Sequence, residues 1–306
     1  MMVLAVLLPL FLASCGTYLL FHYEACNSTR PVPPPHGLAD LARGVAMSFT
    51  GILLIAATAP LHFHLRRFGR RGAPPGLSLL PPVILIHGSD LHAGVWVVLR
   101  RLLIRGGFTR VYCHAWRPSG RPLEEYGAEV DAALLAVDRV FPGERPLVVG
   151  HSMGGLMARI WLHGRHHPES RVAGMVTLGS PHRGSKTARM FGRRKDGLDE
   201  SMAYGSAFFR DMEASETPAA IPCAALYSRM DNIIHPEDAL VPPASAGWKV
   251  LETPPVSHMW LVLHPGICRM VLRELHLALS GAASDKPAGP CGAAVCPERI
   301  EDSAAS

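Results

Sequence analysis

The N-terminal quarter of the chain contains two long stretches made almost entirely of apolar residues. Met1 to Tyr23 and Gly44 to Leu65 carry no Asp, Glu, Lys or Arg. A helix needs about 20 residues to cross the ~30 Å hydrocarbon core of a bilayer, and both stretches are long enough. The pattern predicts hydrophobic helices at about residues 3–21 and 44–65, joined by a Pro-rich loop. On this basis we assign residues 1–71 to a membrane-anchor region.

The first stretch has three interpretations: a cleaved secretory signal, a lipoprotein signal, or the first arm of a helical hairpin. Leu12-Ala13-Ser14-Cys15 resembles a lipobox that ends in the acylated cysteine. Both kinds of signal normally begin with a basic region, which is missing here, so the hairpin is favoured. For the second stretch, the alternative to a membrane-spanning helix is a buried helix of a soluble protein.

Arginines are concentrated on one side of the second stretch. Those that follow it directly are Arg66, Arg67, Arg70 and Arg71, whereas the intervening loop holds only Arg30 and Arg43. The positive-inside bias places the arginine-rich side in the cytoplasm. The sequence therefore predicts a membrane-anchored protein whose remaining chain is cytoplasmic. A lipoprotein or an exported protein is the alternative.

Strand-like and helix-like patterns alternate after a Gly- and Pro-rich linker at residues 72–81. The strand candidates are 83–86, 110–113, 147–149, 172–178, 221–227 and 248–251, and the helical patterns are 95–103, 123–141, 153–162 and 265–279. Apolar strands separated by helices form a mostly parallel sheet with helices on both faces. We therefore predict one α/β domain over residues 82–280, followed by a flexible tail at 281–306.

Overall composition narrows the functional classes. The 306 residues are 48% hydrophobic and 18% charged, which excludes a chain that is disordered throughout. Seven scattered cysteines exclude a disulfide scaffold, and a net charge of +5 is too small for a nucleic-acid-binding surface. Cys291 and Cys296 alone are a weak metal signal. We expect neither a metal nor a cofactor.

Gly150-His151-Ser152-Met153-Gly154 matches the pattern G-x-S-x-G. An apolar strand runs into the motif and an apolar helix leaves it, which is the strand–turn–helix context that the pattern requires. Such a turn exposes the serine above the carboxyl edge of the sheet, and a Cβ on either glycine would collide with neighbouring backbone. Ser152 is therefore the candidate nucleophile.

A serine hydroxyl is a weak nucleophile at neutral pH and needs a histidine base that a carboxylate orients. Asp231 follows the strand candidate 221–227, and His258 follows the candidate 248–251. The chain order Ser, Asp, His is the one such a sheet produces, because all three residues follow strand ends. We therefore select Asp231 and His258. The competing residues are Glu237 and Asp238 for the acid, and His235 and His264 for the base.

The negative oxygen of a tetrahedral intermediate needs hydrogen-bond donors. Met153 supplies one backbone N–H because it follows the nucleophile. The second donor is expected from the loop after the first strand, where His87-Gly88-Ser89 stands. The N–H of Ser89 is the candidate, and an ordinary strand-ending turn is the alternative interpretation.

Four stretches, in this order, carry a family resemblance: 83–88, 150–155, 177–185 and 227–231. The third, Thr177-Leu178-Gly179-Ser180-Pro181-His182-Arg183-Gly184-Ser185, fits the pattern T-L-G-[ST]-P-H-x-G-[ST], which is typical of triacylglycerol-lipase-like proteins. Over roughly Pro81 to Leu279 the chain resembles bacterial serine lipases and esterases of the α/β-hydrolase superfamily. The resemblance implies an α/β-hydrolase fold and cleavage of carboxylic esters without a cofactor.

The same resemblance implies roles for particular residues. The positions that match Ser152, Asp231 and His258 form the triad, and those that match Ser89 and Met153 line the oxyanion hole. Ser89 departs from the aromatic or bulky residue that often follows His-Gly in these enzymes. This departure implies a wider or more polar acyl pocket.

We expect hydrolysis of carboxylic esters, with an acyl lipid as substrate, a membrane as partner and no nucleic acid. Acyl transfer to another acceptor and thioester cleavage would use the same triad, and a catalytically silent membrane-tethered module is the alternative outside the enzymes. Residues 186–218 form the predicted cap, in which apolar residues accompany the basic run Arg193-Arg194-Lys195. The cap is either a lid that touches the membrane or an ordinary helical excursion.

Overall fold

The computed structural model describes residues 2–27, 37–65, 80–118, 121–164, 168–188 and 198–284. Several features predicted from the sequence lie outside these residues. They are the arginines at 66–71, most of the linker, the basic run of the cap, and the tail from residue 285 onward.

Six parallel strands form a single sheet in the order β2-β1-β3-β4-β5-β6. The strands are β1 Val83–Ile86, β2 Val111–His114, β3 Leu147–His151, β4 Gly174–Leu178, β5 Cys223–Tyr227 and β6 Lys249–Glu252. Every residue of β1, β3 and β4 is buried, as expected of strands covered on both faces. The predicted parallel α/β sheet is confirmed.

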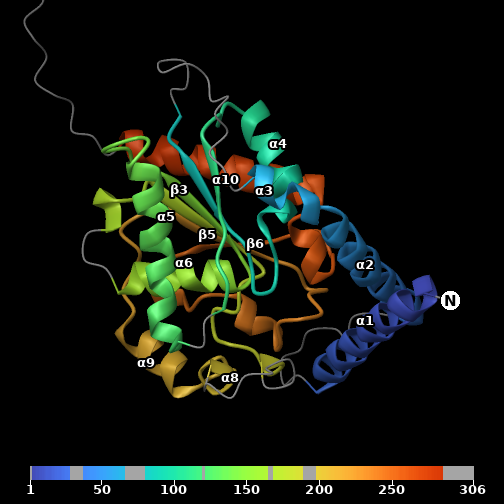
Figure 1. The fold of residues 1–306 in the computed structure, drawn as a ribbon. Coiled ribbons are helices and arrows are strands. Elements are labelled where there is room, and N and C mark those ends of the chain that lie inside the picture. Colours follow the sequence, from blue (N-terminus) through green and yellow to red (C-terminus); the bar gives the residue numbers. More distant parts are fainter. Residues whose placement is uncertain are drawn as a thin grey trace, which may run out of the picture.

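Helices cover both faces of this sheet (Figure 1). On one face α4 (Val97–Arg105) and α10 (Pro265–Ser284) pack with Val83 and Leu85 of β1. On the other face α5 (Ala128–Asp138) and α6 (Met153–His163) pack with the alternate residues, Ile84 and Ile86. The period-two alternation of a strand thus divides the core into two layers.

The other helical elements described after β1 are short. They are η2 Ala93–Trp96, η3 Leu123–Gly127, η4 Pro168–Ser170, α8 Leu198–Ser201, α9 Ala207–Ser215, η5 Glu237–Leu240, η6 Ala244–Ala246 and η7 His258–Leu261. The pattern at 123–141 predicts one helix, but η3 precedes α5 and the helix ends at Asp138. A Cβ added at Gly127 would lie 3.3 Å from Cα of Trp161, so this turn packs closely against α6.

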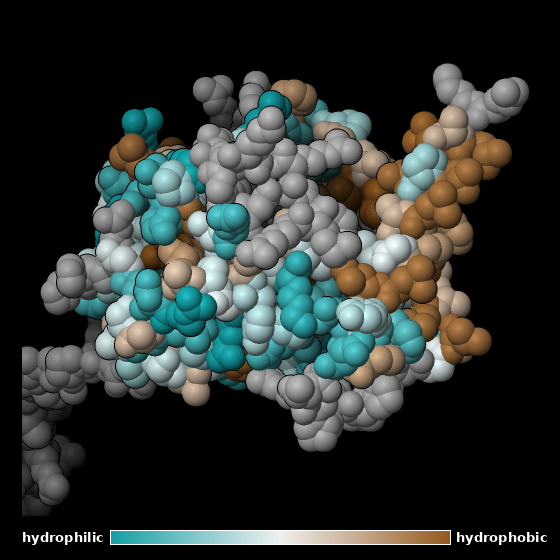
Figure 2. Space-filling view, turned by 90° about the horizontal axis from the view of Figure 1, so that it is seen from below, coloured by the Kyte–Doolittle hydropathy of each residue, from teal (hydrophilic) through white to brown (hydrophobic). Residues whose placement is uncertain are grey.

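The N-terminal residues form a helical hairpin of α1 (Met2–Cys26) and α2 (Leu38–Ala57). The rings of Phe11 and Phe49 pack edge to face, and Gly44 lies against the ring of Tyr18. Among the described residues these two helices are long and apolar enough to cross a membrane. Hydrophobic side chains cover the hairpin at the edge of the molecule (Figure 2).

The second apolar stretch is divided among three helical elements, whereas the sequence pattern predicts one helix over residues 44–65. The helix α2 begins at Leu38 and ends at Ala57, and η1 (Ala59–Leu61) and α3 (His62–Leu65) follow. Pro60 stands at the start of η1. A proline cannot donate the hydrogen bond that would continue α2, which explains the break.

Candidate active site

Ser152 lies in a strained turn between β3 and α6. Its backbone angles are φ 53° and ψ −124°, and α6 begins at the next residue. A Cβ added at Gly150 would lie 2.5 Å from Cα of Gly155, and one at Gly154 would collide with the carbonyl of Ile86. Both glycines are therefore needed for the backbone to pass through this turn. Strain of this kind persists only where the surrounding structure imposes it, which is common at functional sites.

The loop after β1 lies directly against Ser152. A Cβ added at Gly88 would lie 2.9 Å from Cβ of Ser152. Among the described residues, Ser152 and Asp90 are the two non-glycine residues with positive φ, and they lie on these two neighbouring loops. The strand order places them together, because β2 and β3 flank β1 on opposite sides and create a topological switch point there.

The residues predicted for the oxyanion hole lie on these two loops. Met153 is the first residue of α6, and the first N–H groups of a helix have no intrahelical acceptor. Ser89 follows Gly88 and is exposed. The peptide groups of both residues therefore lie beside the serine, on the two sides of the switch point.

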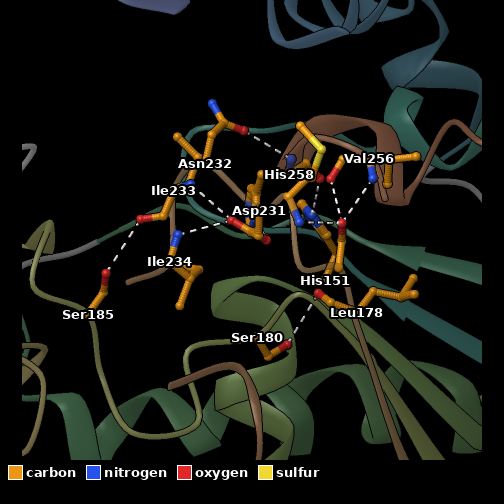
Figure 3. Close-up of polar contacts among 12 residues, drawn as sticks. His151, Leu178, Ser180, Ser185, Asp231, Asn232, Ile233, Ile234, Val256 and His258 are labelled. Atoms are coloured by element: carbon orange, nitrogen blue, oxygen red, sulfur yellow. Dashed lines mark hydrogen bonds and ion pairs between the residues drawn. The ribbon is translucent and has the colours of Figure 1, made fainter. Parts of the chain in front are cut away.

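His258 and Asp231 form a buried pair. The Nδ1 atom of His258 lies 2.6 Å from Oδ2 of Asp231 (Figure 3). The other carboxylate oxygen, Oδ1, accepts the backbone N–H groups of Ile233 at 2.9 Å and Ile234 at 3.0 Å. With both oxygens engaged, the carboxylate is fixed in orientation. It favours the imidazole tautomer with hydrogen on Nδ1, which leaves Nε2 free to accept a proton.

Gly179 brings this pair to the end of β4, beside the serine turn. A Cβ added at Gly179 would lie 3.1 Å from Oδ2 of Asp231 and 3.3 Å from Nδ1 of His258, and its φ is +52°. The neighbouring carbonyl of Leu178 accepts the N–H of Ser152 at 2.9 Å. The three residues selected from the sequence thus converge at the carboxyl ends of β3 and β4.

His151 is fully buried beneath His258. The two imidazole rings are 4.7 Å apart, and Nε2 of His151 is 3.4 Å from the carbonyl oxygen of His258. Burial, followed by the neighbouring charge of His258, holds the pKa of His151 well below its ordinary value. His151 therefore stays neutral and does not repel a positively charged His258.

Ser228 joins the loop that carries Asp231 to the loop that carries His258. Its hydroxyl donates to the carbonyl of Val256 at 2.7 Å and accepts the N–H groups of Met230 at 3.1 Å and Val256 at 2.9 Å. This buried hydroxyl spans two segments that follow different strands. It fixes the relative positions of the acid and the base.

The competing residues have other roles. Asp238 accepts a hydrogen bond from the hydroxyl of Tyr204 at 2.8 Å, and Glu237 lies 3.9 Å from Arg229. Nδ1 of His264 accepts the N–H of Ile267 near the start of α10. The ring of His235 packs against Phe21 of α1, and burial lowers its pKa.

The loop after β4 is fastened to α6 by a buried arginine. Arg159 donates to the carbonyl of His182 and forms an ion pair with Glu216, and all of its side chain is enclosed. His182 in turn lies 3.1 Å from the hydroxyl of Thr177 through its Nε2 atom. The loop next to Gly179 is therefore rigidly held.

Sequence reasoning missed Asn232, which connects the N-terminal hairpin to the base. Its Oδ1 accepts the backbone N–H of His258 at 3.2 Å. Its amide donates to the hydroxyls of Thr17 at 2.8 Å and Ser48 at 3.2 Å. A signal was present in the sequence, because Thr17 and Ser48 are polar residues inside apolar helices.

No group of three His, Cys, Asp or Glu side chains in the described part of the chain is arranged to hold a metal ion. Cys291 and Cys296, the weak metal signal, lie outside the described residues.

Residues 83–287 match the model of the alpha/beta hydrolase family. The chain belongs to this family. Its fold is similar to that of mature Bacillus licheniformis lipase BlEst2, at a TM-score of 0.53 and 16% identity over 67% of this chain and 96% of that chain. It is also similar to that of Aspergillus fumigatus lipase B, at a TM-score of 0.50 and 16% identity over 66% of this chain and 55% of that chain.

The monoacylglycerol lipase of Paleococcus ferrophilus is 18% identical, with a TM-score of 0.46 over 65% of this chain and 96% of that chain. No curated protein matches the sequence. At these identities the similarity concerns the fold alone. The substrate of this alpha/beta hydrolase family member has to be argued from its own residues.

Proposed function

We propose that this protein is a serine hydrolase that cleaves carboxylic esters of acyl lipids through Ser152, His258 and Asp231. The observation that carries the proposal is the buried 2.6 Å contact between His258 and Asp231 at the strand ends that also hold the strained Ser152. An imidazole fixed by a carboxylate near a half-buried serine is the arrangement that activates a hydroxyl.

In the first half of the reaction Oγ of Ser152 attacks the ester carbonyl carbon while Nε2 of His258 takes the hydroxyl proton. The N–H groups of Met153 and Ser89 bind the resulting oxyanion. The intermediate collapses to an acyl-serine, and His258 returns the proton to the departing alcohol. Asp231 holds the Nδ1–H tautomer and stabilises the imidazolium.

Water completes the second half. His258 removes a proton from water, the hydroxide attacks the acyl-serine, and a second oxyanion forms in the same place. Collapse releases the carboxylic acid and returns the proton to Ser152. Each proton taken by His258 is given back, so the enzyme is unchanged after one turnover.

The apolar hairpin supports an acyl lipid as the substrate class. It is joined to the loops of Asp231 and His258, so an apolar surface lies next to the proposed catalytic residues. We propose that the membrane is the partner of this surface and that the catalytic domain lies on its cytoplasmic side.

Labelling with a fluorophosphonate probe tests the mechanism. The probe phosphonylates an activated serine with loss of fluoride, so the wild-type protein should be labelled. Ser152→Ala and His258→Ala should lose labelling while keeping the circular dichroism spectrum of the wild type. Undiminished labelling of Ser152→Ala would remove this serine from the mechanism.

The substrate class needs a separate measurement. Initial rates on esters of increasing acyl length, with thioesters of the same acyl groups as the matched series, should favour long-chain esters. A preference for thioesters at every chain length would contradict the proposed substrate and leave the triad intact.

A further inference from the structure

The second helix of the hairpin contacts the catalytic domain along its whole length. Near its start Arg43 donates to the carbonyl of Pro255 at 3.3 Å. Near its middle the indole N–H of Trp260 donates to the carbonyl of Met47 at 2.7 Å. Beyond its end the carbonyl of Thr58 lies against Gly94, where a Cβ would collide with it. The domain therefore reaches both ends of α2.

The second half of the first helix, α1, contacts the catalytic domain. The hydroxyl of Tyr18 donates to the carbonyl of Met230 at 3.0 Å, and Thr17 accepts the amide of Asn232. At the end of the helix Glu24 forms an ion pair with Lys186 at 2.6 Å. Ser14, Thr17, Tyr18 and Phe21 are all buried, and their spacing of three and four places them on one stripe that faces the domain.

These contacts are incompatible with a bilayer that surrounds the hairpin. The 20 residues of α2 are about 30 Å long, which equals the thickness of the hydrocarbon core. A membrane crossed by α2 would also enclose the loops packed along it. Those loops carry Asp231, and Arg229 with a side chain that is 46% exposed next to the Met230 contact. Exposed charges and loop backbone do not lie in hydrocarbon.

The outward stripe of the hairpin has the opposite character. On α1 the side chains of Leu4, Leu8, Leu12 and Leu19, and on α2 that of Leu54, are between 45% and 69% exposed. Figure 2 shows hydrophobic side chains over this side of the hairpin, which projects from the domain. Met2 to Tyr23 contains no charged residue, whereas the rim of a protein–protein interface is polar. A lipid surface suits a stripe with this composition.

We propose that the hairpin does not cross the membrane but lies in one leaflet, with its outward stripe in lipid and its inner stripe on the catalytic domain. The inference rests on the proposed membrane attachment and specifies its form. The end of α1 is then on the same side of the membrane as the domain. Through Asn232 the lipid-facing hairpin is one residue away from His258.

Cys26 offers a natural reporter for this arrangement because it is exposed at the end of α1. In the full-length protein Cys15, Cys291 and Cys296 are replaced by Ala, and the buried Cys113, Cys223 and Cys268 are kept. A matched chain carries Cys26→Ala and Thr217→Cys, which places a thiol at an exposed site of the domain. Both are treated with a membrane-impermeant maleimide in sealed vesicles of each orientation.

The expected result is labelling of Cys26 and of the Thr217→Cys chain in the same vesicle orientation. Labelling of Cys26 only in the opposite orientation would overturn the proposal, because the end of α1 would then lie across the membrane from the domain. Labelling of Cys26 only after detergent would also overturn it, because the end of α1 would then lie inside the bilayer. Recovery of the intact protein in the soluble fraction would also overturn it. Ester hydrolysis is measured on the same vesicles, so failure of the topology and failure of the proposed activity are distinguished.

A second measurement tests whether another copy of the chain, and not lipid, covers the outward stripe. Leu19→Cys in the same background should react with a lipid-soluble maleimide and form no disulfide between copies under mild oxidation. Efficient cross-linking between copies would identify a dimer interface and contradict the lipid-facing assignment.

Discussion

The side-chain carbonyl of Asn232 accepts the backbone N–H of His258 at 3.2 Å, while the amide of the same residue donates to Thr17 and Ser48 in the N-terminal hairpin. One buried side chain therefore connects the proposed base to both apolar helices. The hairpin is part of the framework of the site, because its two hydroxyls fix the orientation of the amide that holds the His258 loop.

Replacement of Asn232 should lower turnover more than it affects substrate binding. Asn232→Ala removes three hydrogen bonds and leaves the hydroxyls and the His258 N–H without this partner, which should lower the free energy of unfolding by about 1–3 kcal/mol. A small displacement of His258 should reduce kcat roughly 10- to 100-fold with little change in KM. Steady-state kinetics below the unfolding transition measure both constants.

Thr17→Val and Ser48→Ala provide graded controls for this prediction, because each removes one donor–acceptor pair and leaves Asn232 in place. Each should lower kcat less than Asn232→Ala does. A wild-type kcat for a folded Asn232→Ala protein would show that the amide does not position the base.

Asp231→Asn should abolish most of the activity without unfolding the protein. The amide keeps the size of the carboxylate but presents an N–H₂ group that favours the wrong tautomer of His258, so kcat should fall by about 10⁴-fold. Asp238→Asn is the matched control, since Asp238 bonds Tyr204 and not His258. Equal losses in the two variants, measured as kcat on a short-chain ester, would contradict the assignment of the acid.

Gly179→Ala should damage the site through crowding. Its Cβ would meet Asp231, His258 and Leu261, and the φ of +52° is unfavourable for alanine. We expect a loss of about 1–3 kcal/mol in the free energy of unfolding and a kcat reduced by more than tenfold. Gly164→Ala is the control because the contact found for its Cβ is an ordinary one, at 3.5 Å, and its φ is −82°. Chemical denaturation and kinetics of both variants provide the comparison.

Buried histidines should make the protein sensitive to acid. Burial lowers the pKa of His87 to about 4, from an ordinary value of 6.5. Between these values the unfolded chain binds a proton that the folded protein does not, so stability is fully present above pH 6.5 and is lost as pH falls toward 4. A difference of this size is worth about 3 kcal/mol in the free energy of unfolding.

Urea denaturation between pH 7 and pH 4 measures this loss. His87→Phe should flatten the pH dependence, whereas His163→Gln, at an exposed position, should leave it as in the wild type. The lowered pKa values of His151 and His182, both caused mainly by burial, should maintain part of the slope in His87→Phe. An unchanged slope in His87→Phe would contradict the contribution assigned to this residue.

The local pattern of the sequence determined the sheet, the serine turn and the apolar helices. A buried strand followed by G-x-S-x-G predicts a tight strand–turn–helix passage. Gly150 and Gly154 permit this passage, because a side chain at either position would collide with backbone. Strand ends then locate Asp231 and His258, since residues that follow parallel strands collect at one edge of the sheet. These features depend on short-range periodicity and chain order, which a sequence displays directly.

The tertiary structure alone decided how the hairpin sits on the domain and which polar residues connect them. Length and apolar composition are the same for a helix that crosses a bilayer and for one that packs on a protein with one stripe and exposes the other. Thr17, Ser48 and Asn232 are separated by up to 215 positions, and no periodic pattern links residues so far apart. Their contact arises from the packing of complete elements, because buried polar groups must find partners wherever the fold places them.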